Sequence, residues 1–297
     1  MRILIVVNLS AGQGDAGLYE YVRELGRAGA EVVIRFIGPD SPIGASLDDA
    51  ASFDRVVAAG GDGTASFVAF ELRDSNIPVV VFPKGTANLL ALNLQMPVDP
   101  LGLAETTLRG RTVRTDLAAF APERPAADGR PGGFVIMAGA GFDASIMRGA
   151  KELKPVLGAG AYLLSAVQNL QPTIAAFTLD LDGRTVRTEG IAVLLVNFAR
   201  IQFDLAVTHS SDPSDGLLEV VVFHGKTMVD VLPVVWAALL DRLGDHPDRM
   251  NLEIYTAASV RVASDPPLHL QADGEVVEAT TPFEARVLPQ AATFVIP

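Results

Sequence analysis

The sequence contains no cysteine among its 297 residues. Disulfides, thiolate nucleophiles and cysteine-ligated zinc are therefore excluded. Histidine is also scarce, and the four histidines show no spacing that suits zinc; they are His209, His224, His246 and His269.

Runs of basic residues are missing as well. The formal net charge is −12, and no run of lysine and arginine offers a surface to nucleic acid, so we expect no nucleic-acid partner. The same charge gives no long-range attraction to an anionic membrane. Any contact with a membrane should therefore use apolar side chains or a local basic spot.

Long apolar segments are absent too. The apolar run at the N-terminus ends at Asn8, and no small-residue cleavage site follows it. A second run, Val231 to Leu240, lies between Asp230 and Asp241 and is too short to span a bilayer. We expect no transmembrane span and a cytoplasmic protein, with peripheral contact at the membrane as the alternative to a purely soluble one.

What the sequence does have is a large apolar fraction, 49% against 20% charged residues, which is typical of a folded, core-rich protein. Its length allows two domains. A loop rich in proline, glycine and charge covers residues 121–133, and the residue pattern changes there. We place the domains at residues 1–117 and 118–297, and allow the last strand to pack back on the first domain.

The first part alternates between strands and helices. Apolar runs predict strands at Ile3–Val7, Glu31–Ile37, Asp54–Ala59 and Val79–Phe82. Apolar periodicity predicts helices at Leu18–Ala28, Ala65–Leu72 and Leu89–Leu94. This alternation predicts a parallel α/β sheet, whose ligand would lie beyond the carboxyl ends of the strands.

The second part is β-rich and predicts an antiparallel sheet or sandwich with a few helices, one of them at Thr227–Leu243. Asp182-Gly183 predicts a hairpin turn. The expected strands are Thr173–Leu181, Arg184–Thr188, Ile191–Asn197, Leu217–Phe223, Ser259–Ala263 and Glu275–Glu278.

The strongest local feature is Gly60-Gly61-Asp62-Gly63-Thr64, directly after a predicted strand. Glycines let the backbone approach phosphate closely, and the following helix points its positive end at the same place. An acid there can position Mg²⁺ or accept a proton from an attacking hydroxyl. The plain alternative is a tight turn capped by Asp62 and Thr64.

Two further loops follow strands of the same predicted sheet, and parallel strands place such loops at one edge. The loop from Phe82 to Asn88 offers Lys84, Thr86 and Asn88 to a nucleotide, or Thr86 or Asn88 caps the helix that follows. The loop from Asn8 to Gly14 reads by itself as a simple turn.

Taken together, these loops resemble the diacylglycerol kinase catalytic-domain family, which includes bacterial lipid kinases and the sphingosine and ceramide kinases. The resemblance extends in order along nearly the whole chain, through Asn8–Gly14, Gly60–Thr64, Pro83–Ala91, Gly139–Ala144, Gly160–Leu170, Asp215–Val220 and Asp273–Glu275. The chain departs from the family pattern at Leu9, Phe36-Ile37, Ser66-Phe67 and Phe198–Phe203.

The resemblance implies an α/β nucleotide-binding domain, a β-rich second domain and a cleft between them. It implies transfer of a phosphoryl group from ATP with Mg²⁺ to a lipid hydroxyl, on a diacylglycerol-like or sphingoid acceptor at the membrane surface; a homodimer stays open. By the same resemblance the nucleotide-binding residues are Asn8, Ser10, Ala11, Gly12, Gly60, Gly61, Asp62, Gly63, Thr64, Thr86 and Asn88.

The resemblance also assigns roles to acids. Asp273 becomes the general base, with Glu275 beside it, while Asp62 organises magnesium and is the competing base. From local sequence alone, Asp273-Gly274 reads equally well as a hairpin turn. Asp143 would meet the head group of the substrate.

A structural metal is implied as well. Its ligands would be Asp212, Asp215 and the carbonyl of Leu217, since hard oxygen atoms suit Mg²⁺. Without the resemblance, a solvated acidic turn is the simpler interpretation.

Two other functions stay open. One is a small-molecule kinase that shares the first glycine motif, such as an NAD kinase or a phosphofructokinase. The loop Gly85-Thr86-Ala87-Asn88 and the late Asp273-Gly274-Glu275 argue against it. The other is a relative that binds nucleotide or lipid without catalysis, which the departures from the family pattern suggest.

Overall fold

The computed structural model describes residues 1–12, 16–38, 44–123, 132–141, 172–201, 205–206, 211–225 and 251–297. The chain divides into two compact units. The first unit comprises Met1–Leu117, Pro213–Asp215 and Leu288–Pro297, and the second comprises Ala118–Asp212 and Gly216–Val287.

The first unit contains a parallel sheet in the order β2, β1, β3, β4, with the end of β18 parallel to β4. These strands are β1 (Arg2–Asn8), β2 (Glu31–Ile37), β3 (Arg55–Gly60), β4 (Val79–Pro83) and β18 (Phe283–Ile296). Residues 3–7 of β1 are fully buried, as expected for a strand covered on both faces. The predicted parallel α/β sheet is therefore confirmed.

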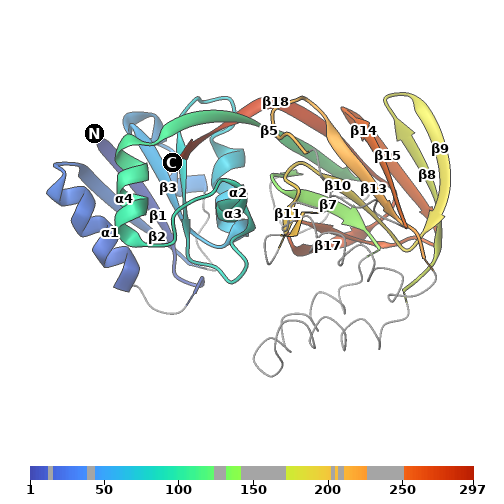
Figure 1. Ribbon diagram of the computed structural model, residues 1–297, viewed down its shortest axis with the longest axis horizontal. Coiled ribbons are helices and arrows are strands. Elements are labelled where there is room, and N and C mark those ends of the chain that lie inside the picture. The colour runs from blue at the N-terminus through green and yellow to red at the C-terminus, as the bar shows by residue number, and fades with distance from the viewer. Residues whose placement is uncertain are drawn as a thin grey trace, which may run out of the picture. The chain divides into compact units, whose positions relative to one another are not determined.

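Helices cover both faces of this sheet. They are α1 (Ala16–Arg27), α2 (Asp62–Glu71), α3 (Leu89–Asn93) and α4 (Pro100–Arg109), and two short 3₁₀ turns occupy η1 (Gly44–Ser46) and η2 (Ala50–Ser52). Figure 1 shows α1 and α4 on one side of the sheet and α2 and α3 on the other. The carboxyl ends of the strands therefore lie beside the N-terminal ends of helices from both faces.

The side that carries α1 and α4 is held by polar contacts inside an apolar layer. The hydroxyl groups of Tyr21 and Thr107 are 2.7 Å apart and buried. Arg55 donates to the carbonyl oxygens of Thr106 and Gly110, each at 3.1 Å. Since Arg55 belongs to β3, these bonds fix the C-terminal end of α4 against the sheet. The Thr106 carbonyl also accepts from the Gly110 amide at 2.8 Å.

The second unit is antiparallel, as predicted. One sheet has the order β14, β13, β10, β7, β16, β17. In the other, β15 pairs with β18 and β8, and β8 pairs with β9. The strands of this unit are β5 (Arg111–Pro122), which begins in the first unit, β6 (Gly133–Phe134), β7 (Met137–Ala140), β8 (Ala175–Leu181), β9 (Arg184–Gly190), β10 (Ala192–Val196), β11 (Arg200–Ile201), β12 (Leu205–Ala206), β13 (Leu218–Phe223), β14 (Leu252–Ala257), β15 (Ser259–Asp265), β16 (His269–Ala272) and β17 (Glu275–Thr280).

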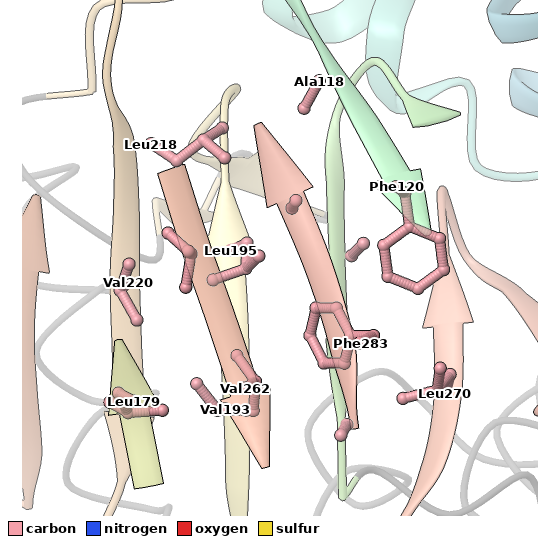
Figure 2. Packing of buried hydrophobic residues seen from close by; sticks show 14 of the residues in the cluster. Ala118, Phe120, Leu179, Val193, Leu195, Leu218, Val220, Val262, Leu270 and Phe283 are labelled. Atoms are coloured by element: carbon pink, nitrogen blue, oxygen red, sulfur yellow. The ribbon is translucent and has the colours of Figure 1, made fainter. Parts of the chain in front are cut away.

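The core of the second unit lies between its two sheets. Figure 2 shows side chains from both, among them Leu195 and Val220 from one sheet and Val262 and Phe283 from the other. The rings of Phe120 and Phe283 meet with their centroids 5.0 Å apart and their planes tilted by 49°. This arrangement, with inner faces packed against each other, is a β-sandwich.

Several local predictions can be compared with these elements. Asp182-Gly183 is the hairpin turn between β8 and β9, with positive φ at both residues, as predicted. Helix α2 begins at Asp62, three residues before the predicted Ala65, so the glycine-rich motif supplies its first turn. Helix α4 was not predicted, although Asp99 followed by Pro100 is a typical helix start; the Asp99 side chain accepts a bond from the Gly102 amide at 2.7 Å.

Some predictions fall outside the described residues. These are the helix at Thr227–Leu243, the segment Gly160–Leu170, and Asp143. Among the helices that the structure does describe, none has the length and apolar character needed to cross a bilayer.

Candidate active site

The loop after β1 folds back on itself and on α2. Asn8 donates from its side-chain nitrogen to the Thr64 hydroxyl at 2.9 Å, and the Ser10 amide donates to the Asn8 side-chain oxygen at 2.9 Å. Gly12 has φ +73°, and a Cβ built on it would lie 2.2 Å from the carbonyl oxygen of Lys84. The first loop therefore contacts both of the other glycine-bearing loops.

The loop after β4 is held just as closely. The Lys84 amide donates to the Gly60 carbonyl at 2.9 Å. A Cβ on Gly85 would lie 2.5 Å from the Cα of Gly61, a distance that only glycine tolerates. Three loops that are far apart in the sequence thus lie together at the carboxyl edge of the sheet, with their backbones in contact.

Asp62 belongs to the second of these loops and is the first residue of α2. Its carboxylate accepts a hydrogen bond from the Leu90 amide at 2.9 Å, which is in the first turn of α3. Burial raises the pKa of the Asp62 carboxyl above its usual value, while the amides of Leu90, Leu89 and Asn88 oppose this shift by stabilising the charged form. A carboxyl group with a raised pKa accepts a proton more readily at neutral pH.

The prediction that the Asn88 side chain caps the helix after this loop, given as an alternative to Thr86, is wrong. Asn88 is the N-cap residue of α3 by position, with φ 50° and ψ 45°, but its side chain makes no capping bond. It instead accepts from the Gly85 amide at 2.8 Å and donates to the Gly85 carbonyl at 2.9 Å. The reason is the left-handed backbone of Asn88, which turns its side chain into the loop and leaves the α3 amides to Asp62.

A pocket of about 330 Å³ lies beside the first and third loops. Its lining includes Gly12, Lys84 and Gly85 from the loops, Gly17 from α1, and Val98 and Pro100 at the start of α4. The Lys84 ammonium is 3.4 Å from the Asn8 carbonyl oxygen. The residues from α4 were missed in the sequence, and the Asp99-Pro100 pair is the signal that would have found them.

The second unit holds the other acids expected in catalysis. Asp273 and Gly274 have φ 47° and 79° and form the turn between β16 and β17, whose ends pair as Ala272 with Glu275. The hairpin interpretation of Asp273 is therefore confirmed, and it does not exclude a catalytic role.

The Asp273 carboxylate is fixed by the backbone of another segment. It accepts from the amides of Val135, Ile136 and Met137 at 2.9, 2.8 and 3.1 Å. These bonds hold the side chain in one orientation and stabilise its ionised form. The side chain of Glu275 is exposed.

The segment that carries the expected metal ligands is exposed. Asp212, Asp215 and Leu217 lie on the surface. In the described part of the chain, no group of three or more histidine, cysteine, aspartate or glutamate side chains is arranged to hold a metal ion. A site here would have to draw on backbone carbonyl oxygens, as the expected Leu217 ligand does.

One buried acid next to this segment was not anticipated from the sequence. Asp116 is fully buried; its amide donates to the Pro213 carbonyl at 2.6 Å, and its carboxylate accepts from the Gln290 amide at 2.6 Å. It thereby ties β5, the segment after Asp212 and β18 together. An acid inside an apolar strand is the signal that could have identified it, because buried acids need partners.

The domain models of two families match this chain. "Diacylglycerol kinase catalytic domain" matches residues 2–120, and "YegS C-terminal NAD kinase beta sandwich-like domain" matches residues 136–296. The two matches together cover nearly the whole chain.

Individual relatives agree with these matches. An uncharacterized protein of Synechocystis is 30% identical over 82% of this chain, which spans 54% of that protein's length. A protein of Klebsiella pneumoniae called "Probable lipid kinase YegS-like" is 25% identical over 97% of this chain and 93% of its own length. A "Diacylglycerol kinase" of Mycobacterium tuberculosis is 26% identical over 98% of this chain and 93% of its own length.

Solved structures share the fold. A putative diacylglycerol kinase from Bacillus anthracis superposes with a TM-score of 0.76 at 19% identity, over 100% of this chain and 97% of that one. At this identity the likeness concerns the fold alone.

Proposed function

This chain belongs to the diacylglycerol kinase catalytic-domain family, and we propose that it is a lipid kinase that transfers the γ-phosphoryl group of ATP to a lipid hydroxyl with the help of Mg²⁺. The observation that carries the proposal is the meeting of three glycine-bearing loops, one of which carries Asp62, at the carboxyl edge of the parallel sheet. Such an edge, with helix N-termini beside it, suits the phosphates of a nucleotide.

The residues of the first unit fit a nucleotide and its metal ion. Gly12, Gly61 and Gly85 let the backbones of the three loops touch, because a Cβ on Gly12 or Gly85 would lie 2.2 or 2.5 Å from neighbouring backbone. Loops in such close contact can turn several amides toward one phosphate group. The first turn of α2 adds its positive end. The Asp62 carboxylate is the acid within this group that would hold Mg²⁺, which neutralises charge that develops on the phosphoryl oxygens.

In the reaction, the lipid oxygen forms a bond to the γ-phosphorus as the bond to the β-phosphate oxygen breaks, and ADP leaves. The hydroxyl proton passes to a carboxylate of the protein. We assign this proton to Asp273 because the family resemblance places the base there, with Glu275 beside it. The three amides that fix the Asp273 carboxylate also favour its charged form and so weaken it as a base. Asp62, whose pKa is raised, is the competing acceptor.

The test is a panel of acceptors with radiolabelled ATP and Mg²⁺. It should contain diacylglycerol, monoacylglycerol, ceramide and a sphingoid base, and also NAD. We expect a phosphorylated lipid with the unaltered protein and none with Asp62→Asn. Phosphorylated NAD without phosphorylated lipid would establish the small-molecule kinase instead, and ADP binding without any product would establish a non-catalytic relative.

A further inference from the structure

The first unit carries an exposed set of apolar side chains that we call the apolar rim: Leu9, Tyr19, Phe36, Val98 and Leu101. Their exposed fractions are 58, 77, 60, 88 and 59%. They are the five most exposed large hydrophobic residues of the described chain, and all five belong to the first unit. Single exposed apolar residues are ordinary, but a gathering of them in one region marks an interaction surface.

The rim follows the carboxyl edge of the parallel sheet. Leu9 directly follows β1, and its amide donates to the Ile37 carbonyl at 3.0 Å, at the end of β2. Phe36 lies opposite Val7 in the register of β1 and β2. The first part of the rim is therefore built on the ends of two adjacent strands, next to the loop that holds Asn8.

The remaining rim residues belong to the helices that start at this edge. Tyr19 lies in the first turn of α1, and Val98 and Leu101 flank the start of α4. The two helix starts touch, since a Cβ on Gly17 would lie 3.7 Å from Pro100. Figure 1 shows α1 and α4 on the same side of the sheet. Val98 also lines the pocket to which Gly12 and Gly85 contribute, so the rim borders the glycine-bearing loops that are proposed to bind phosphate.

The chemistry of this surface favours lipid over a protein partner. Five side chains at these exposures present on the order of 500 Å², less than the roughly 800 Å² that each partner of a stable dimer buries. A lipid surface at the rim would bring a lipid acceptor to the edge of the sheet that carries the three glycine-bearing loops.

The charge of the protein favours membrane contact through apolar side chains over electrostatic attraction to anionic lipid. The chain has a net charge of −12. The arginines on the outer side of α1 are already paired: Arg23 with Glu20 at 3.5 Å and Arg27 with Glu24 at 2.6 Å. Aliphatic side chains accompanied by a tyrosine are the composition that settles at a membrane–water interface.

We propose that the apolar rim is the surface by which this protein inserts into the interfacial layer of a lipid bilayer. The proposal rests on the proposed lipid-kinase function for its purpose, but membrane contact can be measured without turnover. Since the contact is apolar, binding should occur on neutral phosphatidylcholine vesicles and should change little with salt or with the fraction of anionic lipid.

The absence of cysteine allows a site-specific measurement. Val98→Cys and, as the matched control, Ile254→Cys each provide a single thiol for an environment-sensitive fluorophore; Ile254 is 42% exposed and lies on β14 of the second unit. With phosphatidylcholine vesicles and no nucleotide, the emission of the label at position 98 should shift to the blue. The label at position 254 should not respond.

A loss-of-binding variant completes the test. Tyr19→Ser with Leu101→Ser should lower the partition coefficient onto the same vesicles by roughly tenfold, and Ile254→Ser should leave it unchanged. The melting temperature of the double variant should equal that of the parent, since both side chains are mostly exposed. Its turnover should fall on bilayer lipid and persist on a short-chain acceptor dispersed as monomers.

The proposal is overturned if the unaltered protein does not bind neutral vesicles, or if the double variant binds them as tightly as the parent. It is also overturned if the double variant converts a dimer to a monomer while vesicle binding stays the same, since the rim would then join two copies of this chain. If vesicle binding depends on the rim but no lipid is phosphorylated, the proposed function fails and this inference stands.

Discussion

Asp62 combines a structural contact with an unfavourable environment. Its carboxylate caps α3 through the Leu90 amide, and burial still raises its pKa. The folded protein therefore holds this proton more tightly than the unfolded chain does. The stabilising contribution of the group is present at low pH and is lost as the pH rises through the folded-state pKa, so that charged Asp62 costs stability at neutral pH.

This environment leads to a prediction for Asp62→Asn. Asparagine keeps an oxygen for the Leu90 amide and removes the buried charge, so we expect a higher melting temperature than the parent at pH 7. The gain should shrink as the pH falls toward about 3.9, the usual pKa of aspartate. Melting curves between pH 4 and 8, without metal or nucleotide, check this, and a lower melting temperature at pH 7 would contradict it.

The same variant should lose turnover by a factor of roughly 10² or more, because the charge that positions Mg²⁺ is gone. Kinetic assays at saturating ATP measure this loss. Near-normal lipid phosphorylation by a well-folded Asp62→Asn protein would remove Asp62 from the active site.

Asp273 calls for a different experiment because its carboxylate has a structural task. In Asp273→Asn the side-chain amide would face one of the donors at Val135, Ile136 or Met137, so we expect a loss of about 1–3 kcal/mol in the free energy of unfolding. Asparagine tolerates the left-handed backbone at this position, which limits further damage. Thermal and denaturant unfolding measure the loss.

A catalytic role for Asp273 requires more than this structural effect. If it is the general base, folded Asp273→Asn should bind ADP with the parent's affinity and turn over about 10²-fold or more slowly. If Asp273→Asn retains most of its activity, Asp273 is not the general base and Asp62 takes that role. Glu278→Gln is the control, since its side chain is exposed on β17 and it has no assigned role in the reaction.

At the scale of elements, the candidate site depends on loops that touch through glycine. Gly85 lies against Gly61 so closely that a methyl group would meet its Cα at 2.5 Å and the Asn88 side-chain oxygen at 3.0 Å. The loop after β4 can keep this position only without a Cβ. The spacing of the loops after β3 and β4 is therefore set by backbone contact.

Gly85→Ala should accordingly push these loops apart. We expect destabilisation of about 1–3 kcal/mol from overpacking and a marked loss of ADP affinity. Gly26→Ala is the matched control, because a Cβ at Gly26 in α1 meets nothing within 4 Å. It should stabilise the protein by up to about 1 kcal/mol through helix propensity. Calorimetric titration with ADP and melting curves test both, and equal ADP affinity in the two variants would contradict the backbone-contact argument.

At the scale of the whole molecule, a structural cation would add stability that turnover does not require. If Asp212, Asp215 and the Leu217 carbonyl hold Mg²⁺, adding the ion to metal-free protein without nucleotide should raise the melting temperature by a few degrees, as expected for a ligand present at about 100 times its Kd. Asp215→Asn should abolish this shift. If chelation leaves both melting temperature and activity unchanged, the site does not exist.

Much of the architecture could be read from the sequence. Residues 3–7 and the other short apolar runs predicted the parallel strands, because a strand that is buried on both faces has to be apolar along its length. Asp182-Gly183 gave the β8–β9 turn, because few residue pairs adopt positive φ readily. These features depend on residues that are neighbours in the chain, and the ordered motifs along the chain were sufficient for the family.

Only the tertiary structure decided what the polar groups of the site do. Asp62 accepts from the Leu90 amide, 28 positions later, in a helix that begins 27 residues after Asp62. Asp273 accepts from amides more than 130 positions earlier in the chain. The exposure of the apolar rim likewise depends on which elements cover which face. Local pattern determines which element a segment forms, whereas hydrogen-bond partners and exposure depend on segments that meet only after the chain has folded.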